Sequence, residues 1–237
     1  MGKNETSRKA GKTKHTRVNH SLTHPLEKPV LMWLAARTPD RINSDHMSLI
    51  GLLGALLTGV SYLLAKNAPF FLWVAAAGFV LNWFGDSLDG TLARYRKLER
   101  PRYGYFLDHS IDVICITIIL TGLGFSGYSR IELAWGVNLL YLLMIVYTTL
   151  TNFTSRKFQI SFALIGPTEI RILAITASIW LYFNNTRFIH LGFIDLNFFE
   201  AILLLLIIVF VPIYLLSTVV QMRRLAKEDP LPGRPQG

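Results

Sequence analysis

The sequence predicts an all-α integral membrane protein with six transmembrane helices and an amphipathic helix at the membrane interface before them. Hydrophobic residues make up 51% of the chain and charged residues only 16%, against about 25% charged residues in soluble domains. Six apolar segments are long enough to cross a bilayer. Of the 24 Lys and Arg residues, 21 lie in the tails and alternate loops on the side of the N-terminus. Because positively charged loops stay in the cytosol, both termini are expected to be cytosolic.

The N-terminal residues 1–24 are basic and polar, which predicts a disordered tail without the apolar stretch of a secretory signal peptide. A basic tail can bind nucleic acid, but one that precedes membrane segments favours contact with anionic lipid. No nucleic-acid partner is therefore expected. Residues 25–37 are apolar over too short a length to span the bilayer, and Trp33 is flanked by Lys28 and Arg37. This pattern predicts a helix lying in the membrane interface.

The six expected spans form one domain over residues 38–221. Residues 222–237 are polar and rich in Pro and Gly, so they are expected to form a flexible tail. Each span is an apolar run of about 17 residues or more, the length that crosses the hydrocarbon core. In chain order, the expected spans cover residues 46–65, 69–93, 104–125, 131–150, 167–183 and 199–220.

The second and third spans carry four aspartates, and ionisable groups inside a bilayer are costly enough to be candidates for function. Asp86 and Asp89 are three residues apart, while Asp108 and Asp112 are four apart. Each pair therefore lies on one face of its helix. Asp86 and Asp112 each lie about 12 Å from the cytosolic loop between the two helices, at 1.5 Å per residue. Two facing helices would gather the four carboxylates at one depth, on the cytosolic side.

Carboxylates held this close need counter-charge, which bound divalent cations supply. Oxygen ligands without clustered Cys or His favour Mg²⁺ or Mn²⁺, and two ions are expected beside four carboxylates. Such a pair suits chemistry on a phosphate-bearing substrate. Gly90 and Ala93 would let a substrate approach the helix backbone, and Arg94 would meet phosphate oxygens. The same three residues also suit plain helix packing and a positively charged cytosolic anchor.

The spacing of these residues carries a resemblance. Asp86-x-x-Asp89-Gly90-x-x-Ala93-Arg94, nine further residues, and Gly104-x-x-x-Asp108-x-x-x-Asp112 together resemble the signature of the CDP-alcohol phosphotransferase family. The resemblance implies a homodimeric membrane enzyme of phospholipid biosynthesis that moves a substituted phosphate from a CDP-linked donor to an alcohol and releases CMP. It also implies roles for the eight residues: metal ligands Asp86, Asp89, Asp108 and Asp112, with Asp112 also the general base, and CDP contacts Gly90, Ala93, Arg94 and Gly104.

His109 bears on the donor. The run Asp108-His-Ser-Ile-Asp112 is similar to the Asp-His-x-x-Asp of the choline and ethanolamine phosphotransferases, which use CDP-choline or CDP-ethanolamine with diacylglycerol. A histidine there acts as a base near neutral pH, or it orients a neighbouring carboxylate. Those relatives are longer and have more spans, so a chain of 237 residues with six spans is more similar to the compact enzymes that use CDP-diacylglycerol. CDP-diacylglycerol is therefore the expected donor.

The start of the fifth span offers a candidate acceptor site. Glu169 and Arg171 lie there on the same cytosolic rim as the aspartates, although a glutamate in the first turn also suits the helix dipole.

A cation- or proton-coupled transporter is the competing class, because carboxylates line ion pathways too. Such a transporter would place its site near the midplane with broken helices. It would have little use for Gly90, Ala93 and Arg94 spaced around the carboxylates.

Overall fold

The structure of this chain is a computed structural model that describes residues 23–154, 167–184, 189–190 and 195–230. The expected disordered tail falls almost wholly outside the described residues. Within them the regular secondary structure is helical, apart from a two-residue antiparallel pair in which Ile189 is paired with Leu196. The helices are α1 (His24–Arg37), α2 (Ser44–Ala65), α3 (Phe71–Tyr95), α4 (Pro101–Phe125), α5 (Ile131–Thr154), α6 (Pro167–Phe183) and α7 (Phe198–Glu228), and the strands are β1 (Ile189–His190) and β2 (Asp195–Leu196).

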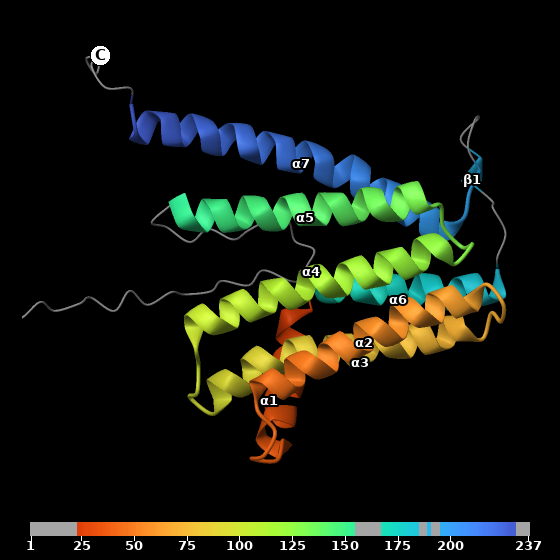
Figure 1. Ribbon diagram of the computed structural model, residues 1–237, viewed down its shortest axis with the longest axis horizontal. Coiled ribbons are helices and arrows are strands. Elements are labelled where there is room, and N and C mark those ends of the chain that lie inside the picture. Colours follow the sequence, from red (N-terminus) through yellow and green to blue (C-terminus); the bar gives the residue numbers. More distant parts are fainter. Residues whose placement is uncertain (1–22, 155–166, 185–188, 191–194, 231–237) are drawn as a thin grey trace, which may run out of the picture.

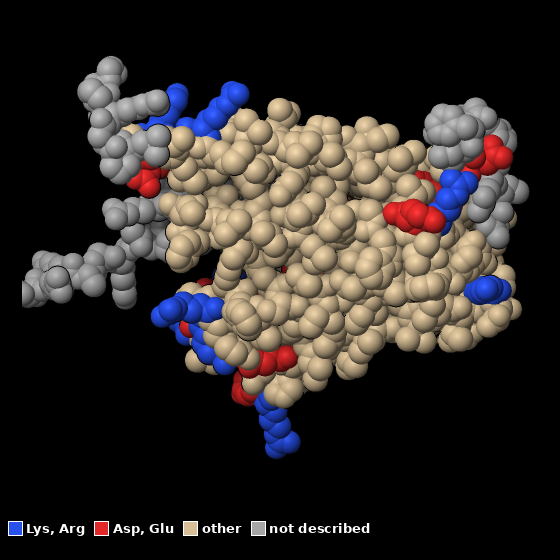
Figure 2. All heavy atoms as spheres, turned by 45° about the horizontal axis from the view of Figure 1, so that its top comes forward, with Lys and Arg blue, Asp and Glu red and all other residues tan. Residues whose placement is uncertain are grey.

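Six of these helices run roughly along one direction, and α1 crosses α2 and α3 steeply (Figure 1). We call the end of the bundle at which α3 ends and α4 begins the site end. Charged side chains gather at the two ends of the face drawn in Figure 2, with a broad band of other residues between them. This distribution, together with the long apolar helices, is that of an all-α integral membrane protein.

Five of the six expected spans are candidate membrane helices among the described residues. Five described helices, α2, α3, α4, α5 and α7, are long and apolar enough to cross a membrane. The expected span at residues 167–183 forms the helix α6, whose 17 described residues stand at the lower limit of the roughly 17–25 that cross a bilayer. The residues before it, 155–166, lie outside the described part of the chain.

The C-terminal helix also extends further than the apolar pattern indicates. α7 continues to Glu228, so residues 222–228, expected within the flexible tail, are helical. Arg224 donates to Glu228 at 2.8 Å, four residues along the same face, and such pairs stabilise a helix beyond its apolar stretch.

The close approach of α2 to α3 positions the second of the expected spans. A Cβ added at Gly54 would lie 2.8 Å from the Cα of Asn82, and one at Gly51 would lie 3.3 Å from the backbone nitrogen of Asp86. Small residues of this kind let two helix backbones meet. The amide of Asn82 then donates to the carbonyl oxygen of Gly51 at 2.9 Å, fully buried. These contacts fix the height of Asp86 against α2.

Candidate active site

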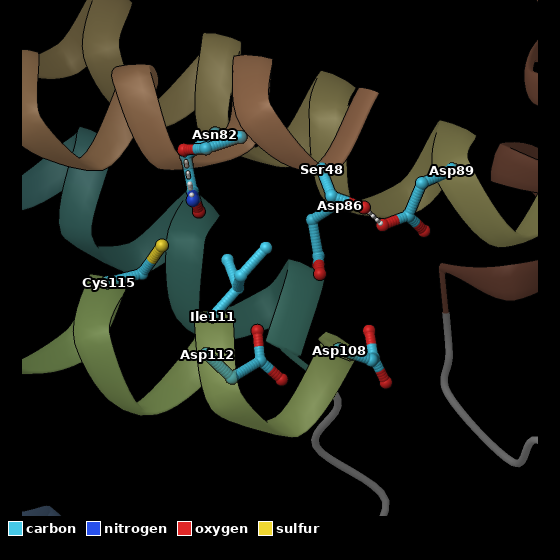
Figure 3. Close-up of a pocket in the computed structure, with 9 residues that line it drawn as sticks. Ser48, Asn82, Asp86, Asp89, Asp108, Ile111, Asp112 and Cys115 are labelled. Atoms are coloured by element: carbon cyan, nitrogen blue, oxygen red, sulfur yellow. Dashed lines mark hydrogen bonds between the residues drawn. The ribbon is translucent and has the colours of Figure 1, made fainter. Parts of the chain in front are cut away.

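Three of the four aspartates converge at the site end. One oxygen from each of Asp86, Asp108 and Asp112 can be chosen so that all three lie within 4.8 Å of one another. Asp86 comes from α3, and the other two come from successive turns of α4. Figure 3 shows the three side chains approaching a common space from the two facing helices. The expected meeting of the two aspartate-bearing helices is thus observed for these three residues.

Asp89 lies apart from this group. It lines the same pocket, but its carboxylate accepts a hydrogen bond from the hydroxyl of Ser48 at 2.6 Å and another from the backbone N–H of Gly90. Figure 3 shows it turned toward α2, next to Ser48. The structure therefore places three carboxylates around one centre and the fourth at the edge of the pocket.

The pocket has further walls that the sequence pattern did not single out as site residues. They are Ser48, Gly51, Asn82, Ile111 and Cys115. Asn82 carries a usable signal, because it is a polar residue four positions before Asp86 in an apolar segment and so shares its face. Cys115 is buried and lines the inner end of the pocket. Ser48 carries no local signal, since its contact with Asp89 bridges 41 residues.

Arg171 of α6 forms an ion pair with the cluster. Its guanidinium lies 2.7 Å from the carboxylate of Asp86, and both side chains are largely buried. Glu169, expected beside it on the same rim, instead accepts hydrogen bonds from the backbone N–H and the hydroxyl of Thr23, each at 3.0 Å. The two residues separate because positions two apart on a helix do not share a face. Of the expected acceptor pair, only Arg171 reaches the aspartates.

His109 lies at the side of the cluster. Its Nδ1 is 3.5 Å from an oxygen of Asp108, and that nitrogen is buried with no hydrogen-bond partner among the described residues. The imidazole packs on the ring of Tyr105, with ring centroids 4.1 Å apart. The Tyr105 hydroxyl in turn accepts a hydrogen bond of 3.1 Å from the amide of Asn152 on α5. This packing holds the imidazole next to a carboxylate, a position that suits both an orienting residue and a base.

The four residues expected to contact CDP lie nearer the site end than the cluster. A Cβ at Gly104 would meet nothing within 4 Å, so this glycine faces open space. The Arg94 guanidinium donates to the Thr91 hydroxyl at 3.2 Å and would lie 3.2 Å from a Cβ on Gly90. Arg94 is exposed and Ala93 is half-buried. An exposed guanidinium above a glycine leaves room for an anionic group to approach.

The donor set fits a hard divalent cation. Carboxylate oxygens within 4.8 Å of one another lie near the separation of ligand atoms around one such ion, whose ligand distances are about 2.0–2.1 Å for Mg²⁺. Among the described residues no group donates a hydrogen bond to Asp112. Three carboxylates facing one arginine leave net negative charge, which a metal ion would neutralise.

Comparison with known proteins gives two relatives. Cholinephosphotransferase 1 of Gallus gallus is 25% identical over 205 residues, which cover 80% of this chain and 59% of the relative. Archaetidylinositol phosphate synthase of Methanothermobacter thermautotrophicus is 29% identical over 114 residues, 47% of this chain and 55% of the relative. The chain thus matches less than two thirds of the length of each.

The family model described as CDP-alcohol phosphatidyltransferase matches residues 44–213. That match runs from the start of α2 into α7 and includes the motif from Asp86 to Asp112. It covers well over half of the chain, and the resemblance seen in the motif is confirmed. The chain belongs to the CDP-alcohol phosphatidyltransferase family.

Proposed function

We propose that this protein is a membrane enzyme that transfers a substituted phosphate group from a CDP-linked donor to an alcohol and releases CMP. The observation that carries the proposal is the convergence of Asp86, Asp108 and Asp112 on one small space, in a chain that belongs to this family. A cation-coupled transporter would also use carboxylates, but it gives no reason for the open glycine and the exposed arginine beside them.

The aspartates are the proposed metal ligands. Asp86, Asp108 and Asp112 would hold Mg²⁺ or Mn²⁺, and Asp89 at the pocket edge would contribute to a second ion. When bound, such ions bind phosphate oxygens and offset the negative charge on the leaving nucleotide. Ser48 holds the Asp89 carboxylate by its hydroxyl at 2.6 Å, and a ligand oriented in this way loses less freedom on binding metal.

The nucleotide is proposed to lie toward the site end, against Gly90, Ala93 and Gly104. The open space at Gly104 admits a ribose or base close to the helix backbone. The exposed Arg94 would donate to the diphosphate, for which a planar guanidinium is well suited.

Asp112 is the proposed general base. Its carboxylate faces the pocket and receives no hydrogen bond from the described residues, so its oxygens are free to accept a proton. In the proposed step Asp112 takes the proton of the acceptor hydroxyl. The acceptor oxygen bonds to the β-phosphorus, the bond from that phosphorus to the bridging oxygen breaks, and CMP leaves.

For the donor, CDP-diacylglycerol is our first candidate, with the reaction on the cytosolic side of the membrane and the enzyme a homodimer. CDP-choline or CDP-ethanolamine with diacylglycerol is the second. Two observations favour the second candidate: His109 beside Asp108, and a relative named cholinephosphotransferase that matches 80% of this chain. Arg171 at the cluster is the proposed contact for the acceptor.

The purified protein in lipid nanodiscs, given Mg²⁺ and each donor with its acceptor, tests this proposal. Release of CMP is the expected result, abolished by EDTA and restored by Mg²⁺ or Mn²⁺. Incorporation of labelled CMP back into the CDP-lipid separates the enzyme from a transporter, which would catalyse no exchange. If the folded protein released no CMP from any of these donors, the result would contradict the proposed reaction.

A further inference from the structure

A carboxylate on α1 connects the interfacial helix to the two elements that form the Asp86–Arg171 ion pair. One oxygen of Glu27 accepts hydrogen bonds from the indole N–H of Trp83 at 2.7 Å and from the hydroxyl of Ser87 at 2.9 Å. The hydroxyl of Thr168, at the start of α6, donates to the same carboxylate at 3.3 Å. Glu27 therefore joins three helices.

These donors lie next to the site. Ser87 follows Asp86 directly in α3. In α6, Thr168 precedes Arg171 by three residues, so Thr168 and Arg171 lie on one face of that helix. Their partners Asp86 and Arg171 form the ion pair of 2.7 Å. Glu27 thus contacts the residue next to Asp86 and the residue one helical turn before Arg171.

A second set of bonds runs in the opposite direction. The backbone N–H and hydroxyl of Thr23, just before α1, donate to Glu169 of α6. We call Thr23, Glu27, Thr168 and Glu169 the α1–α6 clasp. A carboxylate on each helix is held by donors from the other, so the first turn of α6 cannot turn about its axis without breaking a bond on one side. Charged hydrogen bonds of this kind are the stronger ones in proteins.

We propose that Glu27 is a positioning residue: through the α1–α6 clasp it sets Arg171 against Asp86 and so orients this carboxylate in the site. The proposal rests on the proposed function for its kinetic test. Glu27 itself touches none of the three converging aspartates. Its effect is on the angle and height of α6, and small displacements of a group that orients a metal ligand lower activity substantially.

The kinetic test is a double-mutant cycle of Glu27→Ala and Arg171→Ala on CMP release by the full-length protein. Each single variant is expected to lower kcat/KM about 10- to 100-fold, the usual effect of losing an orienting partner. If Glu27 acts through Arg171, kcat/KM of the double variant is no lower than that of the less active single variant. Effects that multiply in the double variant would overturn the proposal.

Matched variants separate positioning from loss of fold. Glu27→Gln keeps a carbonyl oxygen for Trp83 and Ser87 and is expected to recover most of the activity. Thr168→Val removes the hydrogen bond from Thr168 to Glu27 and leaves those to Glu169 in place. Its activity should fall, as that of Glu27→Ala does. Lys28→Ala changes an exposed side chain of the same helix and should behave as the wild type. Loss of activity in Lys28→Ala equal to that in Glu27→Ala would overturn the role assigned to Glu27.

Hydrogen–deuterium exchange tests the clasp without any catalysis. Exchange in the first half of α6, over residues 167–175, should rise in Glu27→Ala and Thr168→Val but not in Lys28→Ala, while the far half of α6 stays unchanged. Unchanged exchange at residues 167–175 would overturn the clasp. If the wild type releases no CMP, the proposed reaction fails, and the exchange result alone then supports or overturns the clasp.

Discussion

A buried glutamate and a cluster of half-buried aspartates lie at opposite ends of this protein, and their surroundings differ. At the end away from the site, Glu200 is fully buried and accepts hydrogen bonds from the backbone N–H groups of Arg130 at 3.1 Å and Asn197 at 3.2 Å. The Arg130 guanidinium lies 3.8 Å away. At the site end, Asp86, Asp108 and Asp112 crowd together with one arginine among them.

The difference lies in how many hydrogen bonds and opposite charges the protein supplies to each carboxylate. Glu200 forms a capping box with Asn197 at the start of α7, so its oxygens are satisfied by the protein and its charge is locally balanced. Such a carboxylate stabilises the fold and has no capacity left for a ligand. Among the described residues the aspartates receive fewer hydrogen bonds and lie close enough to repel one another, an arrangement that a bound cation would stabilise. The number of hydrogen-bond donors around each carboxylate is therefore what separates Glu200 from the proposed site.

The largest expected effect is that of Asp112→Asn on activity. Losing a general base lowers the rate of CMP release by about 1,000-fold, within the range of such catalysis. The thermal stability of the metal-free protein should not fall, because one of three repelling charges is removed. Paired measurements of CMP release and Tm check both statements. A wild-type rate in the folded variant would refute the assignment of the base.

Added Mn²⁺ should raise the stability of the wild type. A ligand that binds only the folded state at 100 times its Kd adds about 2.7 kcal/mol. Asp108→Asn, which removes one of the converging carboxylates, should lose most of the upward shift in Tm on titration with Mn²⁺. Glu200→Gln serves as the control and should keep the full shift. Equal shifts in all three proteins would place the metal elsewhere.

Glu200→Gln tests the structural end of the comparison. Weakening acceptance from two buried N–H groups should lower the free energy of unfolding by about 1–3 kcal/mol. CMP release per folded molecule should stay at the wild-type level, since Glu200 lies at the start of α7, at the end of the bundle away from the site. Unfolding in a denaturing detergent, followed by circular dichroism, measures the first effect. Activity lost without any loss of stability would break the contrast between the two groups.

Ser48→Ala should have the smallest effect. It removes the hydroxyl that holds Asp89 at 2.6 Å and leaves the backbone N–H of Gly90 in place. Loss of one hydrogen bond to a charged group, about 1.5 kcal/mol, corresponds to roughly a tenfold lower apparent affinity for Mg²⁺ in the CMP-release assay. Ser48→Thr, which keeps the hydroxyl, is the matched control. No change in the Mg²⁺ dependence would show that Asp89 contributes little to the metal site.

The sequence by itself determined the fold class and the pairing of the aspartates on their helices. Apolar composition and span length report the membrane environment directly, and spacings of three and four residues place Asp86 with Asp89 and Asp108 with Asp112 because the helical period is local. The motif also identified the family. The same local signals ended α7 too early because its last turns are polar.

Only the tertiary structure decided which charges meet. Arg171 reaches Asp86 from 85 residues away, while Glu169, two residues before it, turns to Thr23 across 146 residues. Asp89 leaves the other aspartates for Ser48, and Glu27 joins α1 to α3 and α6. No local period encodes these contacts, because they depend on the height and rotation at which whole helices pack. That packing is set by close approaches such as Gly54 against Asn82, where the absence of a side chain, rather than its chemistry, determines the geometry of the site.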